Sequence, residues 1–192
     1  QGPYRRCPID VVRNGVDLDR FAPLPADAGQ AMRQQWTQDP DALLLVSNAG
    51  TDDYKGWIDL AQAIALLPDA IRPHVHMAVA GHLPNAQQRA QVQALGDVAA
   101  QVHFTGLLAD TRPLIAAGDV GFVLSNDIET ISFACREMMA SARPMLVSDY
   151  AGLPENIEQG VDGWVVPTRN VAAIAAQVLS LIHISEPTRQ EA

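Results

Sequence analysis

Short apolar runs rich in Val, Leu and Ile alternate along the chain with segments of helical period, and this alternation restricts the fold more than any other feature. Such runs are typical of parallel strands that are buried on both sides. The pattern predicts strands at 9–12, 42–47, 75–80, 101–104, 119–124, 144–148 and 163–166. It predicts helices at 55–67, 85–95, 111–117, 131–142 and 170–178. We therefore expect an α/β fold with a doubly wound, Rossmann-like parallel sheet.

Length, charge and hydropathy restrict what such a chain can bind. It has 192 residues, of which 48% are hydrophobic, enough for one sizeable core. The formal net charge is -9 and the Lys and Arg residues form no basic run, which argues against a nucleic-acid surface. No apolar run approaches the roughly 20 residues of a membrane span. These features predict a soluble domain with a small-molecule partner and no nucleic acid.

Both ends of the sequence look artificial. Gln1 is not an initiator, and the segment LSLIHISEPTR (179–189) resembles the in-frame translation of a transposase-type sequencing adapter. An ordinary polar tail is the alternative. We expect residues 1–178 to form the natural domain and residues 179–192 to be a poorly packed, non-native tail that extends the last helix by at most a turn. The natural protein is then expected to continue on both sides.

In doubly wound sheets, ligands bind beyond the carboxyl ends of the strands. The loops that matter here are those after residues 47, 80, 104, 124 and 148. Two glutamates eight residues apart, Glu129 and Glu137, follow the strand that is predicted to end at Leu124. We therefore expect this glutamate pair at the ligand-binding edge of the sheet.

If one helix carries both glutamates, its geometry places them about 12 Å apart along the axis and roughly 80° apart in azimuth. The start of that helix, near Thr130 to Ser132, would offer free backbone N–H groups, which bind phosphate. A nucleoside diphosphate sugar has the matching order of ribose hydroxyls, diphosphate and sugar hydroxyls. The alternative is a solvated charged stripe. The same helix is expected to turn its apolar side chains to the core, namely Ile131, Phe133, Ala134, Met138 and Met139.

Four blocks, taken in order, resemble the C-terminal domain of GT-B glycosyltransferases of the retaining family 4 (glycosyl transferases group 1). VVRNGVDLDRFAP (11–23) resembles the link from the N-terminal domain, and LLLVSNAGTDDYKGWIDLAQAI (43–64) resembles the first strand, phosphate loop and helix. VHFTGLLADTRPLIAAGDVGFVLSNDIE (102–129) resembles the base-binding turn and its flanking elements. Residues 129–166 resemble the E-x7-E block with its Gly-Leu-Pro-Glu turn. The resemblance implies that this chain is the donor-binding half of a longer enzyme.

The resemblance also implies roles for individual residues. Glu129 would contact the donor sugar and act in catalysis, Glu137 would bind the ribose hydroxyls, and Lys55 would neutralise the diphosphate. The diphosphate would also meet the backbone at Ile131 and Ser132, and the base would lie on the turn at Gly106 and Leu107. No metal and no cofactor other than the sugar nucleotide donor are implied. Lys55 is expected across one cleft from Glu129, near the helix that follows it; a solvated lysine is the alternative.

The implied reaction is sugar transfer with retention from a nucleoside diphosphate to an acceptor hydroxyl. The missing N-terminal domain would bind the acceptor, a saccharide, a lipid or another hydroxyl compound, so this fragment should be inactive alone. Cys7 and Cys135 are far apart in sequence and suggest no pairing, which favours a reduced, cytoplasmic setting. Peripheral membrane attachment through the missing domain is an alternative.

The sequence departs from the family at several places. The phosphate loop has Ser47 and Asn48 where the family usually has an arginine a few residues before the lysine, and Arg136 is a weak substitute. Usual glycines are replaced by Thr130, Ser132, Ala142 and Ala151. These departures keep open a degenerate binding or scaffolding domain that has lost its chemistry. A GT-B epimerase or phosphorylase is a second rival, against which the E-x7-E block argues.

Two other features have structural interpretations. His74 and His76 are expected on one strand face, without a third metal ligand at useful spacing, so we interpret them as structural. Gly81 and His82 follow a strand and either border the phosphate or simply form a loop.

Overall fold

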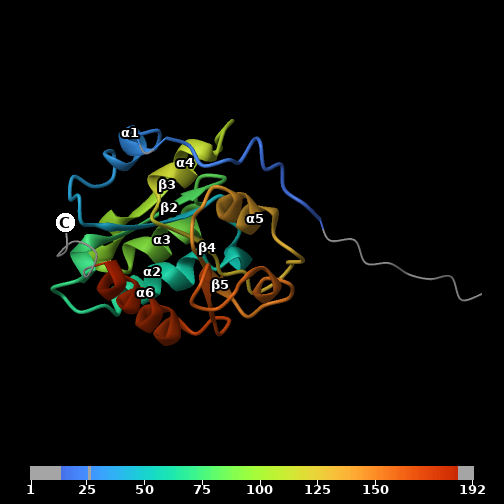
Figure 1. Cartoon of the computed structure of the whole chain (residues 1–192). Helices are drawn as coiled ribbons and strands as arrows, with labels where there is room; N and C mark the ends of the chain where they lie inside the picture. Colours follow the sequence, from blue (N-terminus) through green and yellow to red (C-terminus); the bar gives the residue numbers. More distant parts are fainter. Residues whose placement is uncertain (1–13, 26, 186–192) are drawn as a thin grey trace, which may run out of the picture.

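The computed structural model describes residues 14–25 and 27–185, which contain a six-stranded sheet with helices on both faces (Figure 1). The strands are β1 (Leu43–Ser47), β2 (Val75–Ala80), β3 (Val102–Gly106), β4 (Val120–Val123), β5 (Met145–Ser148) and β6 (Gly163–Val166). All neighbouring pairs are parallel, and their order is β3-β2-β1-β4-β5-β6. The chain thus winds outward in both directions from β1 and β4, which confirms the predicted doubly wound sheet.

Helices cover both faces of this sheet. The α-helices are α1 (Gln30–Arg33), α2 (Trp57–Ala65), α3 (Ala86–Gln93), α4 (Arg112–Ala117), α5 (Phe133–Ala140) and α6 (Val171–Ser185). Short 3-10 turns are η1 (Asp53–Lys55), η2 (Arg72–His74), η3 (Gly96–Gln101) and η4 (Pro154–Asn156). Figure 1 shows α2 and α6 below the sheet and α1 and α4 above it. Within the described ranges, no helix is long and apolar enough to cross a membrane.

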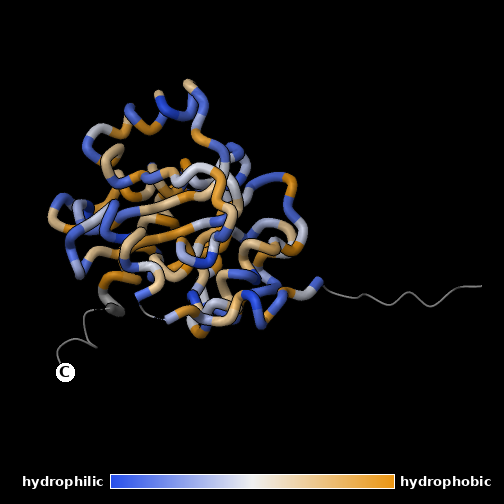
Figure 2. Tube along the Cα trace, turned by 90° about the horizontal axis from the view of Figure 1, so that it is seen from above, coloured by the Kyte–Doolittle hydropathy of each residue, from blue (hydrophilic) through white to orange (hydrophobic). Residues whose placement is uncertain are grey.

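The strands are mainly apolar because the sheet has a hydrophobic core on each face. Along β1, Leu43 and Leu45 belong to the core under α2 and α6, whereas Leu44 and Val46 belong to the core under α4 and α5. This follows from the two-residue period of a strand. The apolar strands run through the centre of the molecule in Figure 2, with polar loops around them.

The sequence placed every described strand within two residues of its observed ends, whereas several helix boundaries differ. The predicted strand at 9–12 lies outside the described residues. The helix predicted to end at 178 continues as α6 to Ser185, about two turns further, so the expected extension of at most one turn is wrong. Leu181 is only 4% exposed and joins the core with α2, so the expected poor packing from residue 179 onward is wrong for Leu181. The side chains of His183 to Arg189, whose burial would overturn the adapter interpretation, lie outside the described part.

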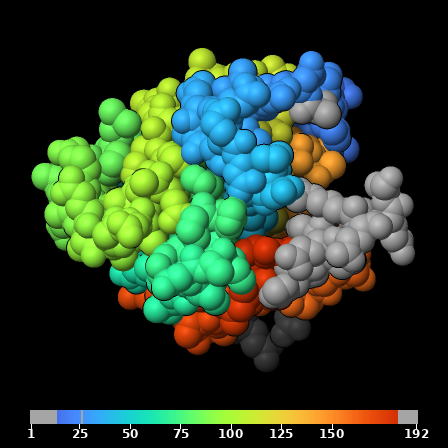
Figure 3. Space-filling model, turned by 90° about the vertical axis from the view of Figure 1, so that its left-hand side faces the viewer, coloured from blue at the N-terminus to red at the C-terminus, as the bar shows by residue number. Residues whose placement is uncertain are grey.

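A cavity of about 500 Å³ lies at the amino edge of the sheet, where Leu43, His74 and Asp119 stand at or just before the starts of strands. Figure 3 looks onto this side, where the blue segment before β1, the green turn before β2 and the red α6 come together. Arg33 organises this edge: its guanidinium donates to Asp119 Oδ2 at 2.9 Å and to the carbonyl of Ala117 at 3.0 Å. Because ligands of doubly wound sheets bind at the opposite, carboxyl edge, we assign this cavity no ligand.

Candidate functional site

The loops after β1 and β4 meet where the strand order reverses, and this crevice is where doubly wound sheets bind ligands. The backbone N–H of Asn126 donates to the carbonyl of Tyr54 at 2.8 Å, which ties the two loops together. Gly56 has a left-handed φ of 71°, and a Cβ there would lie 2.0 Å from the carbonyl oxygen of Leu124. Only glycine fits both the conformation and the contact. Gly56 therefore allows the loop that carries Lys55 to pack closely against the end of β4.

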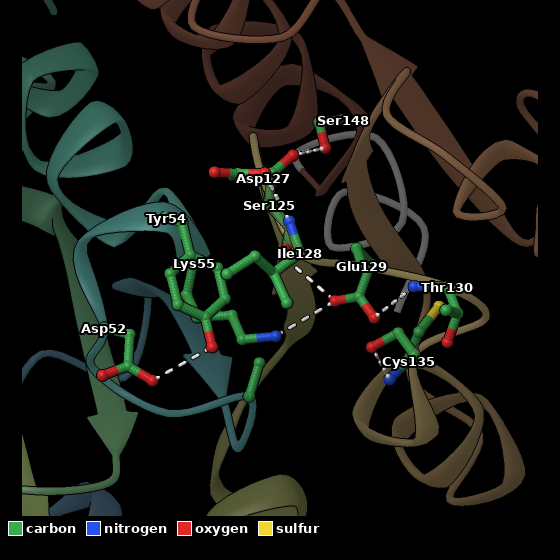
Figure 4. Close-up of polar contacts among 12 residues, drawn as sticks. Asp52, Tyr54, Lys55, Ser125, Asp127, Ile128, Glu129, Thr130, Cys135 and Ser148 are labelled. Atoms are coloured by element: carbon green, nitrogen blue, oxygen red, sulfur yellow. Dashed lines mark hydrogen bonds and ion pairs between the residues drawn. The ribbon is translucent and has the colours of Figure 1, made fainter.

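Lys55 and Glu129 form an ion pair across this crevice (Figure 4). Lys55 Nζ lies 3.2 Å from Glu129 Oε2, and their side chains are 16% and 8% exposed. Ser125 Oγ donates to the same oxygen at 3.0 Å, and the backbone N–H of Thr130 donates to Oε1 at 3.1 Å. The pair confirms that Lys55 lies across from Glu129, as predicted; no contact of Lys55 with α5 itself is among the described interactions. The carboxylate is thus held on both oxygens before any ligand binds.

Glu129 does not lie on the helix that carries Glu137, so the expected single helix is wrong. Helix α5 begins only at Phe133, and Ser132 is its N-cap, with its Oγ accepting from the N–H of Cys135 at 3.3 Å. A hydroxyl at this position satisfies one of the free N–H groups of the first turn. Phe133 was expected in the core but is 59% exposed. Glu129 therefore takes its position from loop contacts and not from helical spacing.

Glu137 faces the end of β1. Its Oε2 accepts a hydrogen bond of 2.6 Å from Asn48 Nδ2. Burial raises the pKa of Glu137 above its ordinary value, while the hydrogen bond from Asn48 and the charge of Arg20 act to lower it. Sequence reasoning singled out Asn48 only as a departure from the family and did not predict this contact, because nothing in the sequence pairs residues so far apart.

A cleft of about 250 Å³ opens at the carboxyl edge, beside Asn48. The other walls come from the loops after β1, β2 and β3: Ala49, Gly50, Thr51, Asp52, Ala80, Gly81, His82, Leu107, Leu108 and Thr111. Leu107 is 71% exposed, and the carbonyl of Gly106, just before it, accepts from the N–H of Gly81 at 3.2 Å. Gly81 and His82 therefore border the same cleft as the predicted base-binding turn.

The loop between β1 and Lys55 is fixed by side chains from neighbouring elements. The carbonyl of Thr51 accepts from Trp57 Nε1 and from Gln88 Nε2, each at 2.9 Å. Gln88 Nε2 also donates to Asp53 Oδ1 at 2.7 Å, and Thr51 Oγ1 donates to the carbonyl of His82. Gln88 was not predicted; its only sequence signature is its place in the capping box that Asn85 opens at α3.

Not all predicted site residues gather in the cleft. Ile131 and Ser132 line a separate small hollow at the start of α5, together with Arg136. Arg136 Nε donates to Asn156 Oδ1 at 2.9 Å, as expected for a structural residue. Among the described residues, no group of three His, Cys, Asp or Glu side chains could hold a metal ion.

His74 and His76 do not share a strand face, contrary to the prediction. His74 lies in η2, before β2 begins, and its Nδ1 lies 2.6 Å from Asp39 Oδ2. His76 lies within β2, and its ring stacks on that of His103, with Nδ1 and Nε2 of the two rings 3.1 Å apart. The two histidines thus belong to different polar contacts.

Three replaced glycines keep a glycine-like backbone. Ser132, Ala142 and Ala151 have φ angles of 31°, 57° and 49°, in the left-handed region that glycine favours. Gly152, the glycine retained beside Ala151, lies so close to Thr130 that a Cβ would be 2.3 Å from its carbonyl oxygen. At these three positions the backbone is thus in a conformation that glycine adopts without strain.

Comparison with known proteins places these features in one family. Residues 40–183 match the family model Glycosyl transferases group 1. The chain is 29% identical over 177 residues to the EpsD protein of Bacillus subtilis (strain 168), covering 92% of this chain and 46% of EpsD. It is 27% identical over 178 residues to D-inositol 3-phosphate glycosyltransferase of Streptomyces scabiei, covering 87% and 39%. The chain thus spans about half the length of these curated relatives or less.

Solved structures share the fold. HepE of Anabaena, crystallised in complex with UDP and glucose, matches with a TM-score of 0.78 and 25% identity over 94% of this chain and 48% of HepE. The C-terminal domain of LpcC from Francisella tularensis, a glycosyl transferase group 1 family protein, matches with a TM-score of 0.68 and 22% identity over 90% of each chain. The second match corresponds to one domain of a longer protein.

Proposed function

The chain belongs to the glycosyl transferases group 1 family as a C-terminal GT-B domain, and from this premise we propose that it is the donor-binding half of a retaining glycosyltransferase. In the proposed reaction, the bond between the anomeric carbon of the sugar and the diphosphate oxygen breaks. A bond from that carbon to an acceptor hydroxyl oxygen forms with the same configuration, and the nucleoside diphosphate leaves. The acceptor would be bound by an N-terminal domain outside this chain.

The ion pair of Lys55 and Glu129 at the strand-order reversal carries the proposal. A diphosphate bound there would take Lys55 as its counterion, and the ammonium would stabilise the negative charge that develops on the leaving group. Glu129 would then turn from Lys55 to the hydroxyls of the donor sugar, still held by Ser125 and Thr130. The pair therefore places a residue that would bind the diphosphate, Lys55, next to one that would bind the sugar, Glu129.

The remaining residues fit the rest of a sugar nucleotide. Glu137 would accept hydrogen bonds from the ribose hydroxyls, and the base would lie on the turn of Gly106 and Leu107, at the border of the cleft. Backbone N–H groups at Ile131 and Ser132 would contribute to the diphosphate site. Each of these assignments is a proposal that the resemblance motivates.

A non-catalytic binding domain is the second candidate, and Asn48 favours it. Where the family usually has an arginine in this loop, the amide of Asn48 contributes no charge for a diphosphate. Comparing the two candidates requires the longer natural protein. Sugar transfer by that protein, abolished by Glu129→Ala, supports the enzyme, whereas donor binding without transfer supports the binding domain.

Calorimetric titration of the present chain with UDP, ADP and GDP, and with the glucose conjugate of each, tests the proposal. UDP is the first choice because HepE was crystallised with it. We expect one base to bind in preference to the others, and we expect the chain alone to transfer no sugar. Absence of binding by all six compounds would contradict the donor-binding role.

A further inference from the structure

The contact between Asn48 and Glu137 leaves one polar atom without a partner. Asn48 Nδ2 donates to Glu137 Oε2 at 2.6 Å, a short hydrogen bond between an amide and a carboxylate. Among the residues that the structure describes, Asn48 Oδ1 is buried and accepts no hydrogen bond. Asn48 also lines the cleft at the carboxyl edge. The amide therefore faces Glu137 with its donor end, while its acceptor end stays buried without a partner.

This orientation is not arbitrary. An ionised carboxylate only accepts hydrogen bonds, so the amide must present its NH₂ group to it and not its carbonyl. A buried carbonyl without a partner is unfavourable. The hydrogen bond to the carboxylate of Glu137 therefore holds the amide in this orientation, although its carbonyl then has no partner. The two side chains thus fix each other.

We propose that Asn48 is the positioning residue for Glu137: its amide holds Oε2, so that Oε1 is left for the hydroxyl groups of a ligand. The inference rests on the proposed function for the identity of that ligand, the ribose of a nucleoside diphosphate. A carboxylate oxygen held in place in this way suits a ribose hydroxyl, which donates a hydrogen bond. Asn48 would then support the binding of the ribose hydroxyls, although it lacks the positive charge that an arginine would offer to the diphosphate.

The charges around Glu137 make the role measurable. Burial raises the pKa of this carboxyl, and the two groups that lower it are Asn48, through its hydrogen bond, and Arg20, through its charge. If Asn48 holds the ionised form, the carboxyl of Glu137 in the ligand-free chain should titrate at a higher pH in Asn48→Ala. The titration midpoint of Glu137 should rise further in Asn48→Asp, where two carboxylates repel each other, and it should fall in Asn48→Arg, where a positive charge favours the ionised form.

The test is a ¹³C NMR titration of glutamate carboxyl groups in the ligand-free chain, with the Glu137 resonance assigned by its loss in Glu137→Gln. Asn170→Ala is the matched control, because it removes another asparagine hydrogen bond, the one from the N–H of Ala173, at the start of α6. We expect the midpoint of Glu137 to be highest in Asn48→Asp, then to decrease through Asn48→Ala and wild type to Asn48→Arg. The control should have the midpoint of wild type. An unchanged midpoint in the folded Ala and Arg variants would overturn the proposal.

A binding experiment separates this inference from the proposed function. We compare UDP with 2′,3′-dideoxyuridine diphosphate at pH 6 and pH 8, so that phosphate ionisation cancels in the ratio of their affinities. Wild type should prefer UDP by about tenfold or more, and Asn48→Ala should lose most of that preference, more so at pH 6. If wild type binds neither UDP nor its ADP and GDP counterparts, the proposed function fails, and the ligand-free titration still decides the role of Asn48. A preference that Asn48→Ala retains at both pH values would overturn the inference alone.

Discussion

At the scale of residues, the charges of Lys55 and Glu129 neutralise each other in the ligand-free chain. Each is largely buried and each is the other's counterion at 3.2 Å. A buried carboxylate or ammonium without a partner is strongly unfavourable, so both charges persist in the crevice because they are paired. In the proposed function, a diphosphate would replace Glu129 as the partner of Lys55, while Ser125 and Thr130 would continue to hold Glu129.

The residues that sequence reasoning found and missed differ in a physical way. Lys55, Glu129 and Glu137 stand in recognisable local patterns, and the resemblance supplied their roles. Asn48 and Ser125 were missed as partners because the sequence does not show which side chains the fold brings together. Asn48 and Glu137 are 89 positions apart and meet only because β1 and α5 lie next to the same crevice.

The histidine pair at β2 and β3 predicts a pH dependence of stability. His103 stacks between Trp36 and His76, and burial first, then the charge of His76, lowers its pKa to about 4. An unfolded histidine titrates near pH 6.5, so between those values the unfolded chain binds more protons than the folded one. The free energy of unfolding should therefore be complete above about pH 6.5 and fall as the pH drops toward 4.

The variant His103→Phe keeps an aromatic ring beside Trp36 but cannot be protonated. We expect the loss of stability between pH 7 and pH 4.5, measured by urea denaturation, to be smaller in His103→Phe than in wild type by roughly 2 kcal/mol. Carboxylate titrations are common to both proteins and cancel in this comparison. Equal pH slopes would show that His103 is not protonated on unfolding.

At the scale of elements, the end of α5 contains a glycine-type turn without a glycine. The N–H of Arg143 donates to the carbonyl of Met138 and that of Ala142 to Met139, the pattern of a Schellman C-cap with Ala142 at φ 57°. Ala142→Gly should raise the free energy of unfolding by about 0.5–1 kcal/mol, because glycine adopts this conformation without strain. Ala140→Gly, at the last helical residue, should lower it by up to about 1 kcal/mol. Urea denaturation of both variants measures these changes in the free energy of unfolding. A loss of stability in Ala142→Gly would contradict the strain argument.

Gly56 and Gly50 form a matched pair in the loop after β1. Both have positive φ angles, of 71° and 97°, but a Cβ at Gly56 would meet the carbonyl of Leu124 at 2.0 Å, whereas a Cβ at Gly50 has nothing within 4 Å. Gly50→Ala should reduce stability by about 1–2 kcal/mol through backbone strain alone. Gly56→Ala adds a clash and should reduce it by at least about 3 kcal/mol. Thermal denaturation measures the difference, and equal losses would mean that the contact with β4 is unimportant.

The elements themselves were predictable to different degrees. Strands were predicted well because burial on both faces makes most of them short, mainly apolar runs. The four-residue helix α1 was missed because it is too short to show a period. The helix of the E-x7-E block was predicted two residues too long at each end, because loop contacts of Glu129 and the turn at Ala142 replace helical geometry there.

At the scale of the whole molecule, the strand order determines the position of the site. The order β3-β2-β1-β4-β5-β6 places the loops after β1 and β4 side by side, although Lys55 and Glu129 are 74 positions apart. The alternation of strands and helices predicted the doubly wound class, but it did not predict the order of the strands. The same sheet gives the amino edge its cavity near Arg33, away from this crevice.

The central claim is a division of labour between Glu129 and Glu137 on one sugar nucleotide, and calorimetry with the two alanine variants tests it most directly. Each is titrated with UDP and with UDP-glucose, or with the base that wild type prefers. Glu137→Ala should weaken both ligands by roughly ten- to a hundredfold, since hydrogen bonds to a carboxylate are worth about 1.5–3 kcal/mol. Glu129→Ala should not weaken the bare nucleotide, because the substitution leaves Lys55 free for the diphosphate, and it should weaken the sugar nucleotide alone. Equal weakening of both ligands by both variants, or no weakening by either, would contradict the account.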